Sequence, residues 1–164
     1  LGVETGITSR NRNDSYVSDC TIETDQLALI PDTYIDMTAE KIRIYKELDS
    51  LSSDKELDNM KERLEDRFGP VPEELSRLFD IVRIRQLGER LGFEKIIIKN
   101  GVMIAFFISN PLSQYYRSDR FSKVLEGITL NPNVFELKQN DNRLRIVSRN
   151  VDGTSKAYSL LKKL

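Results

Sequence analysis

The sequence predicts an α+β fold, in which three consecutive helices are followed by antiparallel hairpins with further short helices. Helical periodicity of apolar residues runs through residues 38–92, and helix-capping residues interrupt it. Beyond residue 92 the period shortens, and Asn100-Gly101 separates two β-branched runs, as in a two-residue hairpin. Because the helices precede the hairpins instead of alternating with strands, we expect a largely antiparallel sheet.

The chain divides into two expected parts, residues 1–19 as a flexible linker or tail and residues 20–164 as one domain. The first part has no hydrophobic period and contains the polar stretch RNRNDS. A β-rich run over residues 20–30 predicts a strand that ends at Pro31. Thr38 is placed to cap the first helix, whose apolar side recurs every three residues at Ile42, Tyr45, Leu48 and Leu51.

The second and third helices have clear end signals. Ser53 and Glu56 form the pattern of a capping box, and Gly69 with the proline after it ends the second helix. Pro72 is suited to the first position of the third helix, which ends at Gly92. The second helix has a narrow apolar stripe, formed by Leu57, Met60, Leu64 and Phe68. The third is apolar on more than one side, so we expect it to be central.

Two hairpins complete the prediction, within residues 96–108 and 134–148. Ser118 is placed to cap a short helix between them. The closing helix carries Ala157, Leu160, Leu161 and Leu164. Tyr115 and Tyr116 are interpreted as an edge of the core in preference to a contact site.

Composition limits the classes of protein. The chain has 164 residues, with 25 Lys and Arg against 26 Asp and Glu, so no global field attracts nucleic acid or an anionic membrane. No apolar run approaches a membrane span, and no signal peptide is recognisable. The single Cys20 excludes a disulfide framework and fits a cytoplasmic protein, in which we interpret it as a small strand residue. Since the sequence starts without methionine, we expect a fragment of a longer chain.

The residue types present argue against catalysis. Without histidine there is no Ser-His-Asp or Cys-His arrangement, and one cysteine cannot build a zinc site. Glycine-rich phosphate-binding motifs are absent as well. We therefore predict no catalytic residues, no metal ligands and no cofactor in this chain.

Paired carboxylates are the remaining catalytic candidates. Glu65 and Asp66 are adjacent on a helix and point about 100° apart, so a solvated helix face is favoured over an acid/base site. A carboxylate-dependent hydrolase is retained as a minor alternative. Glu73 and Glu74 are interpreted as first-turn residues that complement the helix dipole.

A basic run on the third helix gives a second candidate function. Arg83, Arg85 and Arg90 are possible contacts for nucleic acid or RNA polymerase. Because these arginines alternate with core positions and no aromatic platform lies among them, this reading is the weaker one.

Five sequence blocks, in order, resemble the C-terminal domain of the bacterial transcription-repair coupling factor. They are ALIPDTYI from residue 28, IRIYKELDSL from residue 42, LEDRFGPVP from residue 64, IVRIRQLGERLGFEKI from residue 81, and the glycine hairpin. The similarity covers residues 27–107, is loose beyond residue 109 and is absent before residue 20.

The resemblance implies a non-catalytic, regulatory domain of a large cytosolic motor in transcription-coupled nucleotide excision repair. Such a motor uses ATP and Mg to translocate on DNA behind stalled RNA polymerase, and recruits UvrA through a UvrB-like module. The C-terminal domain acts in the family as an autoinhibitory lid on that module. Motor motifs are missing here, which agrees with a fragment.

The resemblance also implies the residues of the lid contact. Asp66 is expected to face basic residues of the UvrB-like module. The family often has an acid three residues earlier, where this chain has Arg63, so Glu62 and Glu65 are alternatives for that role. With Arg67, these residues form the predicted interdomain interface.

Overall fold

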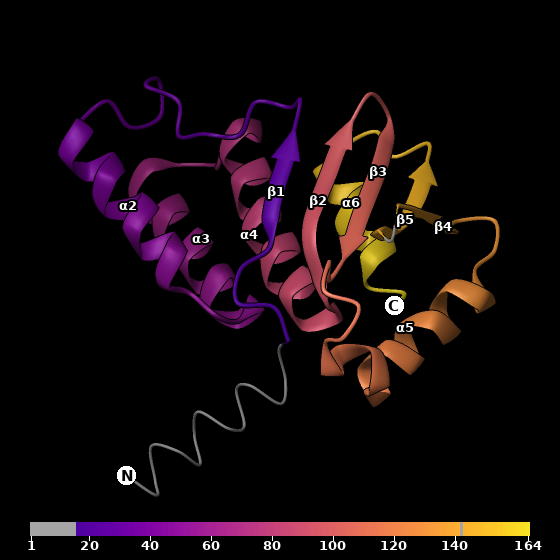
Figure 1. Ribbon diagram of the computed structural model, residues 1–164. Helices are drawn as coiled ribbons and strands as arrows, with labels where there is room; N and C mark the ends of the chain where they lie inside the picture. Colours follow the sequence, from indigo (N-terminus) through magenta and orange to yellow (C-terminus); the bar gives the residue numbers. More distant parts are fainter. Residues whose placement is uncertain (1–15, 142) are drawn as a thin grey trace, which may run out of the picture.

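The computed structural model describes residues 16–141 and 143–164 and contains three consecutive helices followed by hairpins and short helices, as predicted (Figure 1). The elements are β1 (Thr21–Thr24), α2 (Thr38–Ser50), α3 (Asp54–Phe68), α4 (Glu73–Leu91), β2 (Phe93–Lys99), β3 (Val102–Phe107), the 3-10 helix η1 (Gln114–Arg117), α5 (Asp119–Leu130), β4 (Glu136–Asn140), β5 (Arg143–Arg149) and α6 (Thr154–Leu161). No helix of the described part is long and apolar enough to cross a membrane.

One sheet has the strand order β1-β2-β3-β5-β4. All its pairs are antiparallel except β1 with β2, which run parallel because three helices connect them and provide a long crossover. The predicted strand over residues 20–30 is shorter than expected. It ends at Thr24, whose hydroxyl accepts a hydrogen bond from the Gln26 N–H at 3.2 Å and turns the chain out of the sheet.

Local end signals formed most helix boundaries as predicted. The side chains of Ser53 and Ser118 accept hydrogen bonds from backbone N–H groups of α3 and α5, each at 3.2 Å. The predicted cap at Thr38 is wrong, because Met37 occupies the N-cap position of α2 and makes no side-chain cap bond. Pro72 lies at the N-cap of α4 and not at its first helical position, so this helix begins one residue later than predicted.

Glycines with positive φ form the expected turns. Asn100 and Gly101 have φ values of 55° and 74°, the combination that a type I′ hairpin requires. Gly92 ends α4 in the left-handed region, with φ 102° and ψ 26°. Behind Gly92 lies the fully buried Tyr115, whose hydroxyl donates to the Leu91 carbonyl, so the tyrosine belongs to the core.

Two hydrophobic cores share helix α4. The helical core joins α2, α3 and the loop before α2, and α4 contributes Leu75, Phe79 and Val82 to it. The sheet core joins the strands, α5 and α6, and α4 contributes Ile84 and Leu91. The prediction that this helix is central and buried on more than one side is therefore confirmed.

Helices cover only one face of the sheet in the described part. Side chains from alternate strand positions point into the sheet core, among them Ile96, Ile98, Met103, Ala105, Phe107 and Ile146. Figure 1 shows α4 and α6 behind the strands, with α6 packed on α4. The opposite face of β2, β3, β4 and β5 carries no helix.

Most of the expected tail, residues 1–19, lies outside the described residues. Of the four that are described, Val17 is buried at the sheet core, and the ring of Tyr16 meets the Tyr115 ring edge-on, with centroids 5.6 Å apart.

Candidate functional site

Helix α3 carries most of the predicted interface, and its packing determines which side chains face outward. Leu57, Met60 and Leu64 are buried in the helical core. At about 100° per residue, Glu62 and Asp66 therefore fall on the opposite side of the helix, one turn apart. Both side chains are exposed.

We call Glu62, Glu65 and Asp66 the acidic ridge. Among the described residues, neither Glu62 nor Asp66 has an ion-pair partner, so both carboxylates are available to a binding partner. Glu65 accepts one long hydrogen bond, 3.5 Å, from the Val71 N–H. The ridge therefore presents negative charge that the domain itself does not neutralise.

The end of α3 beneath the ridge is held in place by Tyr34. Its hydroxyl donates to the Leu64 and Gly69 carbonyls, at 3.2 Å and 2.8 Å, and its ring packs against Phe68. Burial, and secondly the negative charge of Glu65, raise the pKa of Tyr34, so the hydroxyl stays a donor at neutral pH. The ridge is thus built on an anchored helix end.

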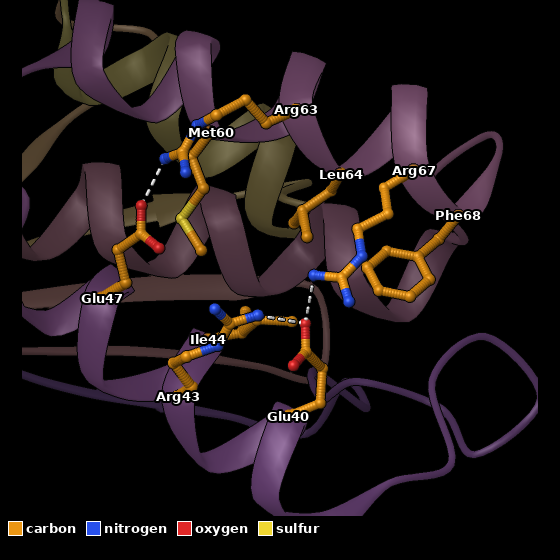
Figure 2. Close-up of a pocket in the computed structure, with 9 residues that line it drawn as sticks. All are labelled: Glu40, Arg43, Ile44, Glu47, Met60, Arg63, Leu64, Arg67 and Phe68. Atoms are coloured by element: carbon orange, nitrogen blue, oxygen red, sulfur yellow. Dashed lines mark hydrogen bonds and ion pairs between the residues drawn. The ribbon is translucent and has the colours of Figure 1, made fainter.

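Arg63 and Arg67 point the other way, into a groove between α2 and α3 (Figure 2). The groove encloses about 230 Å³ over an apolar floor formed by Ile44, Met60, Leu64 and Phe68. Arg67 bonds Glu40 at 2.7 Å and stacks on the Phe68 ring, and Arg63 pairs with Glu47. Arg43 shares Glu40, which gives this groove three arginines and two glutamates.

The predicted interface is therefore divided between two surfaces. Glu62, Glu65 and Asp66 form the acidic ridge, while Arg63 and Arg67 bind helix α2 of the same domain. Sequence reasoning missed Glu40 and Glu47. Glu40 and Glu47 are seven residues apart on one helix, and Arg63 and Arg67 are four apart on the next, so each pair lies on one side of its helix. These two spacings could have indicated the ion pairs.

The three arginines of the alternative reading differ in their surroundings. Arg83 lies among three carboxylates, those of Asp58 at 2.7 Å, Asp54 at 3.7 Å and Asp80 at 3.9 Å. Arg85 pairs with Asp49 at 3.4 Å, while Arg90 is exposed. Since internal carboxylates already offset Arg83 and Arg85, a phosphate would have to compete with them.

In the part of the chain that the structure describes, no group of side chains favours the hydrolase alternative. Glu65 and Asp66 are adjacent on α3, so their side chains point about 100° apart around the helix, and both are exposed. Within residues 16–141 and 143–164, no three His, Cys, Asp or Glu side chains are grouped as a metal site.

The fold is that of the C-terminal domain of a transcription-repair coupling factor. A crystal structure of such a domain matches the chain with a TM-score of 0.74 and covers 88% of each chain, at 18% sequence identity. The family follows from sequence. A TRCF domain model matches residues 24–118, and the chain belongs to this family.

Relatives named transcription-repair-coupling factor extend the match. Those of Rickettsia conorii, Staphylococcus epidermidis and Escherichia coli are 32%, 37% and 35% identical to the chain, over 133, 105 and 75 residues. The aligned parts cover 80%, 64% and 46% of this chain but 11%, 9% and 6% of the relatives. The chain thus spans about a tenth of their length.

Proposed function

We propose that this domain is a non-catalytic, autoinhibitory lid that binds a UvrB-like module and keeps it from recruiting UvrA. The observation that carries the proposal is the acidic ridge: Asp66 and Glu62 are exposed, adjacent on one helix face and without ion-pair partners among the described residues. Such a surface fits a partner with basic side chains, as the family resemblance implies.

A lid has to release as well as bind, and charge contacts suit this task. A polar, charge-complementary interface can be moderate in strength while still selecting its partner. Two ion pairs that are desolvated on closure would contribute about 1–3 kcal/mol each, which shifts a closed–open balance roughly 5- to 150-fold per pair. Because the ridge lies on a helix end anchored by Tyr34, closure need not order a flexible segment first.

The test is binding in trans, with the chain and a UvrB-like module of a transcription-repair coupling factor as separate proteins. Asp66→Lys should raise the dissociation constant about tenfold or more, because it places like charges together. Asp66→Asn should give an intermediate value. Glu126→Lys is the matched control, since it reverses one exposed charge on α5 and should bind like the unmodified chain.

Two further measurements connect binding to regulation. The chain should compete with UvrA for the module, and Asp66→Lys should lose this competition. Salt should weaken the complex, as expected for exposed ion pairs. If Asp66→Lys and Glu62→Lys both bind and compete as the unmodified chain does, the acidic ridge is not the lid contact.

A further inference from the structure

The uncovered face of the sheet has an ordered pattern of side chains. Strand register places Ile97, Ile104 and Val147 side by side in one row across β2, β3 and β5. The same row ends at Glu23 on β1 and at Glu136 on β4. An apolar stripe therefore crosses the strands, with a carboxylate at each end.

Basic rows flank this apolar stripe on both sides. Two residues along the strands in one direction, the register aligns Lys95, Phe106, Arg145 and Lys138. Two residues in the other direction, it aligns Lys99, Val102 and Arg149. The stripe and its basic rows together are the outer sheet face.

The apolar residues of the outer sheet face lie outside both hydrophobic cores. Val102, Ile104, Phe106, Ile97 and Val147 belong to neither hydrophobic cluster, although their neighbours on alternate positions do. Val147 is only 7% exposed and the other four are half-buried. The stems of long basic side chains can cover apolar surface of this kind while their charged ends stay in water. Next to Val147, a hollow of about 310 Å³ opens against the loop that precedes β4.

The charge of this face is opposite to that of the acidic ridge. Two of its carboxylates each pair with two basic side chains. Glu23 lies 3.2 Å from Lys95 and 3.7 Å from Lys99. Glu136 lies 3.5 Å from Arg149 and 3.7 Å from Lys138. Glu94 pairs with Arg143 at 3.6 Å.

These ion pairs join five basic side chains to three carboxylates, and Arg145 on β5 is a sixth basic side chain, although the whole chain has a net charge of −1. Among the described residues, Arg145 has no carboxylate partner. With the Asn140 amide oriented so that its oxygen faces Arg145, that oxygen accepts from the guanidinium at 3.0 Å. The outer sheet face therefore carries an excess of positive charge.

We propose that the outer sheet face binds an acidic amphipathic helix of a protein partner, with its apolar side on the stripe and carboxylates over both basic rows. The dimensions agree. The stripe extends about 10 Å from Ile97 to Val147, and helix positions i and i+7 are about 10.5 Å apart. The basic rows are about 13 Å apart, close to the 10–12 Å diameter of a helix.

A protein partner fits this surface better than nucleic acid does. An apolar centre inside a charged rim is the usual composition of a protein interface. Single-stranded nucleic acid is bound on aromatic platforms, whereas the stripe is aliphatic. The one aromatic ring of this face, Phe106, already has the Arg143 guanidinium over it, 5.2 Å from its centroid.

The probe is a fluorescent 18-residue helical peptide, with leucines at i, i+3, i+4 and i+7 and glutamates on both sides of them. It should bind saturably, and its binding should shift the NMR signals of β2, β3 and β5. Arg145→Glu and Ile104→Ser should each weaken binding about tenfold, since one introduces like charges and the other removes apolar contact. A control peptide with lysines in place of the glutamates should not bind.

Matched variants separate this face from the rest of the molecule. Lys46→Glu reverses an exposed charge on α2 and should leave peptide binding unchanged, as should Asp66→Lys on the acidic ridge. The circular dichroism melt of each variant establishes that it is folded. Absence of saturable binding, or equal binding by Arg145→Glu and Ile104→Ser, would overturn the proposal. So would tight binding of a single-stranded oligonucleotide at this face in place of the peptide.

Discussion

Replacing Gly92 by alanine should be among the most destabilising single-methyl changes in this domain. An added Cβ would lie 2.6 Å from the Tyr115 hydroxyl oxygen and closer still to two ring carbons. The ring cannot move away easily, because Tyr115 is fully buried and packs against Phe107, Tyr116 and Phe121. Its hydroxyl bond to the Leu91 carbonyl would be strained as well.

The magnitude follows from three contributions. An L-residue in the left-handed region costs about 1–2 kcal/mol, and overpacking a well-filled core costs about 1–3 kcal/mol. A weakened buried hydrogen bond adds about 1 kcal/mol. We expect the Gly92→Ala variant to lose about 4 kcal/mol of unfolding free energy.

Gly101→Ala is the matched control. Gly101 also has a positive φ, 74°, but an added Cβ there meets nothing within 4 Å, so only the backbone cost of about 1–2 kcal/mol remains. Urea unfolding followed by circular dichroism measures both losses. In a Tyr115→Leu background, Gly92→Ala should cost no more than Gly101→Ala. Equal losses for the two glycine variants in the unmodified chain would refute the steric reasoning.

Two further predictions concern ionisable groups whose pKa values are raised by burial. Burial raises the pKa of Asp80 above its usual 3.8, although Thr154 and Arg83 oppose the shift. The folded state therefore holds this proton more tightly, and Asp80 favours folding less as pH rises from about 4 towards neutrality. Urea unfolding at pH 4 and pH 7 should show Asp80→Asn gaining stability relative to the unmodified chain at the higher pH, and an unchanged difference would contradict this. Burial, with nearby Glu89 and Asp19, also raises the pKa of Cys20 to about 12. Cys20 is 1% exposed, so its thiol should resist a disulfide reagent at pH 8 until urea unfolds the protein. Rapid stoichiometric labelling of the folded protein would contradict its burial.

Elements whose signals are local could be predicted from the sequence. The Ser53 cap and the Asn100-Gly101 turn depend on a few neighbouring residues, and both formed as expected. Pairing of β1 with β2 depends instead on packing between residues far apart in the chain, so neither its parallel direction nor its short length could be predicted. The Thr38 prediction failed because the chain enters α2 one residue earlier.

The candidate site shows the same division. The outward position of Asp66 follows from the apolar stripe of α3, which periodicity alone indicates. The turning of Arg63 and Arg67 towards Glu47 and Glu40 depends on how α2 and α3 cross, and a single sequence does not specify that crossing. The two basic rows of the outer sheet face depend on strand register in the same way.

The sharing of α4 by two cores has a consequence for how the domain responds to its partners. A helix of 19 residues is roughly 28 Å long, and the first half of α4 packs in the helical core while its second half packs in the sheet core. Because α4 packs in both hydrophobic cores, unfolding of either core would expose apolar side chains of this helix. If the two surfaces bind partners as proposed, binding at α3 should also protect the sheet against unfolding, and binding on the sheet should also stabilise the end of α3. We therefore expect the two oppositely charged surfaces to unfold together, because they share α4.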